Sequence, residues 1–281
     1  MFDTPKLNRE RKTPFPTSEE DIIRSSLQPH TPQTQSPVYE LAFHDPDFLC
    51  REELRPVRLQ LELLKPELIL QEHGITSTVV LFGGARIPAP GAEPGGKTEI
   101  AKKNLAANAH FYEEARRFAV LASEEALKRD QKEYVVVSGG GPGVMEAANR
   151  GAEDAGALSI GLNIVLPHEQ APNHYVSPEL CFNFHYFAIR KMHFLMRAKA
   201  IAVFPGGFGT LDEMFEVLTL IQTERVAPMP IILFNEKFWR RIVNFEALAE
   251  EGTISPEDLD LFQFVETAEA GWDIIKQQYG L

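Results

Sequence analysis

The sequence has little cysteine, no excess of basic residues and no long hydrophobic run. Its 281 residues include only Cys50 and Cys181, which cannot make a disulfide framework and therefore predict a reducing, cytoplasmic location. Lysine and arginine number 28 against 40 aspartates and glutamates, which argues against nucleic acid as the main partner, because a phosphate backbone demands clustered positive charge. No run approaches the roughly 18 apolar residues of a membrane helix, and the amino-terminal segment lacks the apolar centre of a signal peptide. We therefore expect a soluble protein without a membrane or nucleic-acid partner.

Glycine is missing from the first quarter of the chain. None of the 19 glycines precedes Gly74, whereas six of the 20 prolines fall in the first 40 residues. This contrast predicts a polar, proline-rich arm over 1–47, an N-terminal helical extension over 48–74 and a main domain over 75–281. Pro56 and Pro66 are expected to break the extension into pieces.

The main domain alternates between short apolar runs and helical segments. A long helix is expected over 99–129 and another over 186–199, and the β-branched runs predict strands at 77–82, 134–137, 158–166, 200–204 and 230–234. Continuous apolar strands that alternate with helices are typical of a parallel sheet covered on both faces. The predicted fold is therefore α/β, a Rossmann-like doubly wound parallel sheet with an N-terminal helical extension, and ligands are expected at the carboxyl ends of the strands.

The usual nucleotide, metal and hydrolase motifs are also missing. The sequence has no G-x-x-x-x-G-K-[ST] and no G-x-G-x-x-G with a later acidic residue, which argues against a P-loop and against hydride chemistry. It has no H-E-x-x-H, no Cys/His cluster and no G-x-S-x-G. We expect no metal and no cofactor. If the glycine-rich turns described next bind a phosphate, the remaining ligands are a mononucleotide or a sugar phosphate.

Three glycine-rich turns each follow a predicted strand: FGGAR, SGGGPGVME and PGGFGTLDE. Glycine permits a sharp turn and lets backbone amides approach a ligand, and a helix that follows points its free amides at an anion. Tight strand-to-helix connections also use glycine for steric reasons alone, but two such turns opening helices of one sheet favour a phosphate site. The candidate binding residues are Gly83, Gly84, Gly140, Gly141, Gly143, Met145, Gly206, Gly207 and Gly209.

The third turn leads into an acidic segment. Thr210 is expected to be a helix N-cap with Glu213 at the third helical position, so T-x-x-E can be a capping box. The Thr210 hydroxyl can equally hold a phosphate, with Glu213 one short step from a bound sugar. Asp212 and Glu216 complete the acidic first turns, and beside a phosphate cradle we favour a functional role for them.

Arg190 and Lys191 lie in an otherwise apolar helix just before the third turn. They can be snorkelling side chains on a solvated face. Because the helix leads into the strand that delivers the candidate site, we favour binding of a phosphate or an anionic transition state. The apolar residues around this helix predict that it is either internal or shared with a second subunit.

Arg190-Lys191 together with GGGPGVM and PGGFGTLDE resembles the Lonely Guy (LOG) family, many members of which were misnamed lysine decarboxylases. The resemblance covers about 77–249, and the N-terminal 70 or so residues have no counterpart in the short family members. It implies hydrolysis of the N-glycosidic bond of AMP or of an N6-substituted cytokinin nucleotide to free base and ribose 5-phosphate. It also implies that Arg190 and Glu213 are the catalytic pair, that the GG-x-GT turn binds phosphate, and that the protein is a homodimer or a higher homo-oligomer.

Two other functions can be weighed against this hypothesis. A non-catalytic nucleotide-binding or carrier protein on the same scaffold is the main alternative, although a pure binder would not need Glu213. A pyridoxal-dependent decarboxylase would need a Schiff-base lysine in a larger fold, and no lysine here stands in that context. The sequence alone leaves open whether Arg190 acts on the phosphate, on the base or on Glu213.

Overall fold

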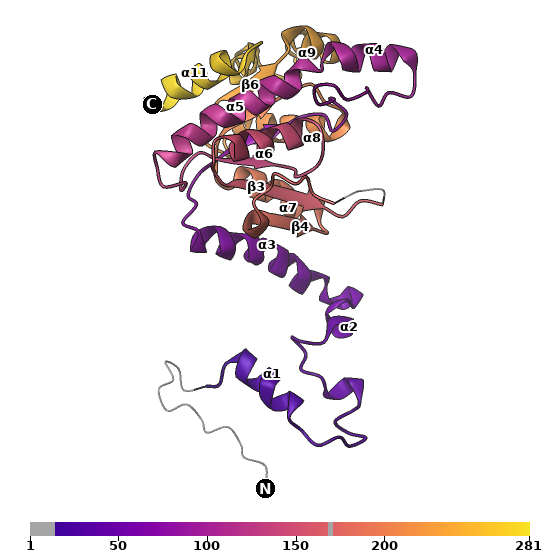
Figure 1. Ribbon diagram of the computed structural model, residues 1–281. Coiled ribbons are helices and arrows are strands. Elements are labelled where there is room, and N and C mark those ends of the chain that lie inside the picture. The colour runs from indigo at the N-terminus through magenta and orange to yellow at the C-terminus, as the bar shows by residue number, and fades with distance from the viewer. Residues whose placement is uncertain (1–14, 168–170) are drawn as a thin grey trace. The chain divides into compact units, whose positions relative to one another are not determined.

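The computed structural model describes residues 15–167 and 171–281, so the first 14 residues of the predicted arm lie outside the described residues. The chain divides into two compact units, residues 1–60 and residues 61–281. Figure 1 shows the helices and strands of each unit in the order of the chain.

The first unit contains short helices: α1 (Ser18–Ser26), η1 (Pro37–Tyr39), α2 (Pro46–Leu49), η2 (Glu52–Leu54) and the start of α3 (Arg55–Glu72). Helix α1 was not predicted, and it starts with a capping box in which the Glu20 amide donates to Thr17 at 3.2 Å and the Thr17 amide donates to Glu20 at 3.1 Å. Its local caps explain a helix in a polar, proline-rich segment. No side chain in residues 15–60 is buried, so the described part of this unit has no apolar interior.

The second unit is built on a parallel sheet, which confirms the predicted doubly wound α/β fold. In the described residues the strand order is β4-β3-β2-β1-β5-β6-β7, and every pair of neighbours is parallel. The strands are β1 (Thr78–Phe82), β2 (Val135–Ser138), β3 (Ser159–Ile164), β4 (Cys181–Phe184), β5 (Ala198–Val203), β6 (Ile231–Phe234) and β7 (Gln263–Val265). The edge strands β4 and β7 were not predicted, because each is short and carries an Asn or Gln among its apolar residues.

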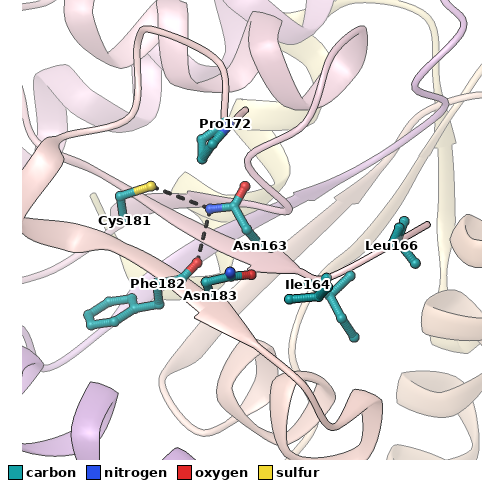
Figure 2. Close-up of a pocket in the computed structure, with 8 residues that line it drawn as sticks. Asn163, Ile164, Leu166, Pro172, Cys181, Phe182 and Asn183 are labelled. Carbon is teal, nitrogen blue, oxygen red and sulfur yellow. Dashed lines mark hydrogen bonds between the residues drawn. The ribbon is translucent and has the colours of Figure 1, made fainter. Parts of the chain in front are cut away.

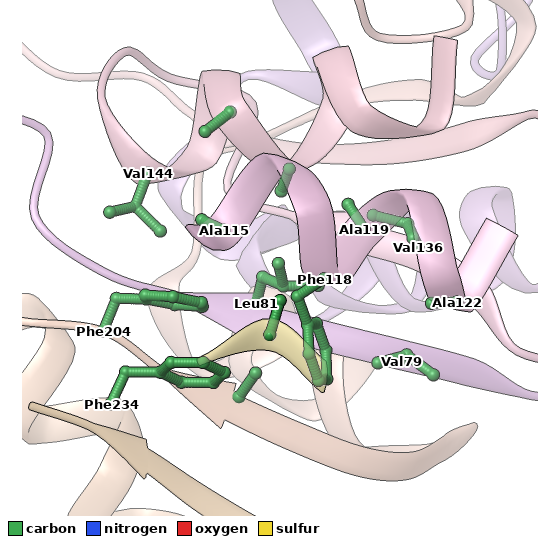
Figure 3. Close-up of a cluster of buried hydrophobic side chains, with 14 of the residues drawn as sticks. Val79, Leu81, Ala115, Phe118, Ala119, Ala122, Val136, Val144, Phe204 and Phe234 are labelled. Carbon is green, nitrogen blue, oxygen red and sulfur yellow. The ribbon is translucent and has the colours of Figure 1, made fainter. Parts of the chain in front are cut away.

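The side chains of alternate strand residues belong to two separate apolar clusters, one on each face of the sheet. Val79 and Leu81 of β1 belong to the first cluster, with side chains of α5 (His110–Leu127), α6 (Val144–Asp154) and α11 (Ala268–Tyr279). Figure 3 shows part of this cluster, in which the rings of Phe204 and Phe234 stack with centroids 4.0 Å apart. Val80 and Phe82 belong to the second cluster, with side chains of α7 (Phe187–Leu195), α8 (Phe208–Gln222), α9 (Glu236–Ile242) and α10 (Phe245–Glu250). Two layers of helices therefore bury both faces of the sheet, as all-parallel sheets require.

The helix predicted over 99–129 is two helices, α4 (Glu99–Ala107) and α5. Asn108 ends α4, and its side-chain amide donates to the carbonyl of Asn104 at 3.1 Å. The remaining short helices are η3 (Pro178–Leu180) and η4 (Pro256–Leu261).

Helix α3 runs without a break through Pro66, contrary to the prediction. A proline inside a helix leaves the carbonyl four residues earlier without its usual donor. Here that carbonyl belongs to Glu62, and the Nε2 atom of His193 in α7 lies 3.3 Å from it. Burial lowers the pKa of His193, so the ring is neutral and can donate this hydrogen bond from Nε2. A side chain of α7 therefore replaces the missing backbone donor.

Glu62 and Glu67 of α3 also hold two other elements in place. The Glu62 carboxylate accepts the amides of His185 at 2.7 Å and Tyr186 at 3.0 Å, which precede α7. Glu67 accepts two hydrogen bonds from Arg197, both 2.7 Å long, at the start of β5. The last turns of the N-terminal extension thus position the helix that carries Arg190 and Lys191.

Among the helices that the structure describes, none is long and apolar enough to cross a membrane.

Helices α5 and α6 pack closely at a single glycine, and this contact gives a test of the fold. A Cβ atom at Gly151 would lie 2.1 Å from the carbonyl oxygen of Arg116, so Gly151→Ala must push the two helices apart. We expect it to lower the free energy of unfolding by about 2 kcal/mol, the usual range for overpacking. Urea denaturation measures this change. Gly209→Ala is the matched control, since its Cβ would meet nothing within 4 Å, and we expect it to change stability by less than about 1 kcal/mol.

Candidate functional site

The three glycine turns predicted from the sequence meet at the carboxyl ends of the strands. Strands β1 and β5 are neighbours although three other strands lie between them in the chain, which makes their ends the switch point of the sheet. The Gly84 amide of the first turn donates to the Pro205 carbonyl of the third at 3.0 Å. The Val144 amide, directly after the second turn, donates to the Gly84 carbonyl at 3.3 Å. The turns therefore form one interlocked edge.

Packing accounts for several of these glycines. A Cβ at Gly83 would lie 2.5 Å from the Val144 side chain, and one at Gly143 would lie 2.4 Å from the Gly84 oxygen. Gly143 also has a φ of +70°, a conformation that favours glycine. For these residues the steric explanation is sufficient. Gly207 and Gly209 differ, because a Cβ at either would meet nothing within 4 Å and the space beside them is open.

The capping-box prediction at Thr210 is wrong. Gly207, in an extended conformation, is the N-cap of α8, so the helix begins at Phe208 and Thr210 is its third residue. The first amides of a helix have no helical acceptor, so those of Phe208, Gly209 and Thr210 are available to an anion. The Thr210 hydroxyl lies against Gly206, where a Cβ would approach it to 2.1 Å, and Thr210 is buried.

Arg190 is buried and held rigidly, so the surface interpretation does not apply to it. Its Nε atom donates to the Leu162 carbonyl at 2.7 Å, and its guanidinium lies 5.1 Å from the centre of the Phe194 ring. Its Nη2 atom lies against Gly139 of the second turn, 2.7 Å from where a Cβ would stand. The sulfur of Met145 lies at the same distance, 2.7 Å, from that position.

Arg190 and Glu213 lie together, as expected of a functional pair. The Nη1 atom of Arg190 is 3.5 Å from Oε1 of Glu213, and the two side chains are 10% and 15% exposed. Burial raises the pKa of Glu213 to about 7, with Asp212 adding to the shift, although Arg190 opposes it. Near neutral pH the carboxyl group therefore populates both protonation states, and it can accept or donate a proton.

Lys191 points to a different set of acids. Its Nζ atom lies 3.0 Å from the Asp212 carboxylate and 3.1 Å from the Glu216 carboxylate. Burial lowers the pKa of Lys191, but the hydrogen bonds to these two acids outweigh it and the pKa is raised. The predicted residues Lys191, Asp212 and Glu216 thus form their own ion-paired cluster beside the Arg190–Glu213 pair.

A polar network that the sequence did not reveal holds the second turn. Ser138 donates to Oδ1 of Asn149 at 2.7 Å and accepts the Gly140 amide at 3.0 Å. Asn173 donates to the carbonyls of both Gly140 and Gly141 at 3.0 Å. These asparagines fix the path of the turn, and no spacing in the sequence links positions 138, 149 and 173.

A cavity of about 690 Å³ opens beside the second turn, within the usual size of a small-molecule site. Its lining includes Ala85, Gly141, Glu146, Asn163 and His174. Figure 2 shows a neighbouring cavity of about 330 Å³, which shares Asn163. The Asn163 amide nitrogen donates to the Phe182 carbonyl at 2.9 Å, which fixes the side chain between the two cavities.

Within residues 15–167 and 171–281 no group of three or more His, Cys, Asp or Glu side chains is arranged to hold a metal ion.

Together these features define the class of protein: an all-parallel α/β protein with a helix start and three glycine turns at the switch point of its sheet and a buried arginine–glutamate pair beside them. The family model described as "Possible lysine decarboxylase" matches residues 145–275, a little under half of the chain. Two curated relatives are similar to this chain over a comparable length. The Arabidopsis thaliana cytokinin riboside 5'-monophosphate phosphoribohydrolase LOG3 is 28% identical over 138 residues, which are 48% of this chain and 62% of the relative. The probable cytokinin riboside 5'-monophosphate phosphoribohydrolase LOGL5 of Oryza sativa subsp. japonica is 29% identical over 126 residues, 43% of this chain and 50% of the relative. The resemblance to the Lonely Guy family is thereby confirmed, and the matches span between half and two thirds of the length of these relatives.

Solved structures of similar chains are more distant. The X-ray structure of TM1055 is 20% identical with a TM-score of 0.46, and the match covers 72% of this chain and 99% of that one. The molybdenum cofactor binding protein from Rippkaea orientalis is 19% identical with a TM-score of 0.45, over 73% of this chain and 98% of that one.

The raised pKa of Glu213 makes stability depend on pH. The proton is held more tightly in the folded chain than in the unfolded one, so the stabilisation is fully present below about pH 4.5 and is lost as the pH rises through about 7. Glu213→Gln imitates the neutral carboxyl group and removes this loss. We compare the free energy of unfolding of Glu213→Gln with that of the wild type at each pH. We expect this difference to favour the variant by roughly 3 kcal/mol more at pH 8 than at pH 4.5, because the pKa shift implies that amount.

Urea denaturation of both proteins at the two pH values measures this difference. Glu124→Gln, at an exposed position of α5, is the control and should change stability equally at both pH values. A difference between wild type and Glu213→Gln that does not vary with pH contradicts the assignment of a neutral, buried carboxyl group.

Proposed function

We propose that this protein hydrolyses the N-glycosidic bond of a purine nucleoside 5'-monophosphate, AMP or an N6-substituted cytokinin nucleotide, to the free base and ribose 5-phosphate. The observation that carries the proposal is the Arg190–Glu213 pair, buried at 3.5 Å beside the glycine turns, with a Glu213 pKa of about 7. The names of the curated relatives support the same activity.

Glu213 is the group that acts on the sugar. Departure of a purine builds positive charge on the anomeric carbon, and a carboxylate stabilises that charge or orients the attacking water. Its ionised form serves both purposes. A pKa of about 7 lets the same group take up the proton that the water releases, and the desolvated setting strengthens its attraction for the developing charge.

Arg190 acts through Glu213. With Nε committed to the Leu162 carbonyl and Nη1 facing Glu213, the guanidinium favours the ionised carboxylate. Of the roles that the sequence left open, this arrangement supports the one in which Arg190 helps to keep Glu213 ionised.

The third turn binds the 5'-phosphate. The amides of Phe208, Gly209 and Thr210 are available at the start of α8, and the space at Gly207 and Gly209 is open. Phosphate binding at this remote point orients the glycosidic bond toward Glu213.

Activity on nucleotides tests the proposal. A panel of 5'-monophosphates is incubated with the protein, and the free bases are quantified by chromatography. We expect base release from AMP or an N6-substituted analogue, and a fall of about a thousandfold or more in kcat for Glu213→Gln, because the group that stabilises the transition state is lost. Nucleotide binding, measured by calorimetry, should survive in this variant.

Two controls separate the alternatives. Adenosine should react far more slowly than AMP, since it cannot use phosphate binding for orientation. Glu124→Gln should release base at the wild-type rate. Tight nucleotide binding without any base release by the wild type would refute the hydrolase and leave a nucleotide-binding or carrier protein.

The chain also carries the apolar surface that a homodimer needs. Phe187 and Met192 of α7, and Met196 at its C-cap, are each about half exposed, and Phe208 at the start of α8 is 92% exposed. Large exposed apolar side chains are typical of an interface. We propose that a second copy covers these side chains, close to Arg190 and Glu213.

Light scattering at micromolar concentration tests the assembly. We expect a mass near twice 31.6 kDa for the wild type and a shift toward the monomer for Met196→Glu, because a buried unpaired charge destabilises an apolar interface. Glu153→Gln, an exposed change on α6, should leave the mass unaltered. A fully active preparation with a mass near 31.6 kDa would refute the shared interface.

A further inference from the structure

Glu146 is a carboxylate in the 690 Å³ cavity that the proposed mechanism does not use. It is the third residue of α6 and follows the second glycine turn directly. Among the lining residues that the structure describes it is the one carboxylate, beside side chains such as Asn163 and His174. An acid in a first helical turn often only balances the helix dipole, so its surroundings decide its role.

A hydrogen bond from a buried tyrosine holds the side chain of Glu146 in place. The Tyr112 hydroxyl donates to Oε1 of Glu146 at 2.6 Å, and Tyr112 is fully buried in the first apolar cluster. Burial and this hydrogen bond raise the pKa of Tyr112 to about 12, so the phenol stays protonated and keeps donating. In the described residues no hydrogen bond engages Oε2, although Glu146 lines the cavity. A buried donor thus fixes one oxygen and leaves the other for a ligand.

The cavity adjoins the proposed reaction site. Gly141 lines the cavity, and Gly139 of the same turn contacts Arg190. On the next strand, Asn163 lines the cavity and the preceding residue, Leu162, accepts the hydrogen bond from Arg190. A nucleotide whose glycosidic bond lies at Glu213 therefore extends along this edge toward Glu146.

We propose that Glu146 recognises the vicinal hydroxyl groups of the ribose and so selects ribonucleotides over deoxyribonucleotides. A carboxylate accepts hydrogen bonds and repels phosphate, so Glu146 cannot belong to the phosphate cradle. The hydrogen-bond donors of AMP are the two ribose hydroxyls and the amine of the base. The hydroxyls lie between the phosphate and the base, whereas the amine lies at the far end of the nucleotide. This inference rests on the proposed function and adds the sugar to its specificity.

Binding of matched nucleotides tests the proposal without turnover. In the Glu213→Gln background, calorimetry compares AMP with its 2'-deoxy and 3'-deoxy analogues and with inosine 5'-monophosphate, which lacks the amine. We expect AMP to bind about tenfold to hundredfold more tightly than a deoxy analogue, the usual value of a hydrogen bond to a charged group. Adding Glu146→Gln should reduce this preference to within about threefold, while the ratio of AMP to inosine 5'-monophosphate stays unchanged. Glutamine keeps an acceptor for Tyr112, so the cavity wall is retained.

Controls distinguish this inference from the proposed function. Glu153→Gln, at an exposed position of the same helix, should keep the full preference for AMP. Glu146→Ala must also lose the preference for AMP over the deoxy analogues, since alanine offers no hydrogen-bonding group to the ribose. If Glu146→Gln keeps the preference, or changes the inosine ratio instead, the ribose assignment is overturned while the hydrolase stands. Failure of any nucleotide to bind or react overturns both.

Discussion

The close approach of three backbone turns is the constraint on which the site depends. The Gly84 carbonyl accepts the Val144 amide at 3.3 Å and stands where a side chain at Gly143 would have to lie. The Gly84 amide in turn binds the Pro205 carbonyl at 3.0 Å. Each contact joins residues far apart in the chain, and together they set the starting points of α6 and α8. The side chains of Glu146 and Glu213 are therefore placed by the same set of backbone contacts.

The charges around α7 and α8 are distributed unequally along this edge. Asp212 and Glu216 share Lys191, and both lie close enough to it for ion pairs. Glu213 faces Arg190 at 3.5 Å, but burial outweighs that attraction and its pKa is raised. Two acids thus balance a cation for structure, and the third keeps a proton equilibrium in the physiological range.

Much of this arrangement could be predicted from the sequence. Apolar β-branched runs placed β1, β2, β3, β5 and β6, and the glycine turns located the carboxyl edge, because buried strands and tight turns leave local signatures. The short edge strands β4 and β7 lack such signatures. The start of α8 was placed three residues late, since a threonine that can cap a helix does not do so when a preceding glycine adopts the cap conformation. The polar network of Ser138, Asn149 and Asn173 joins positions up to 35 residues apart, and only the folded chain reveals it.

The proline inside α3 has a consequence for where the folded domain begins. Because Pro66 has no amide hydrogen, the Glu62 carbonyl is left to His193, and the Glu62 carboxylate holds the amides before α7. A shortened chain that started at β1 would contain every strand of the sheet and every glycine turn. It would nevertheless lose the partners of His193, His185 and Arg197 at once, and expose the apolar surface that Leu70 covers. The helix that carries Arg190 would then be tethered only by its own packing, so the smallest autonomous version of this protein includes a segment that precedes its sheet.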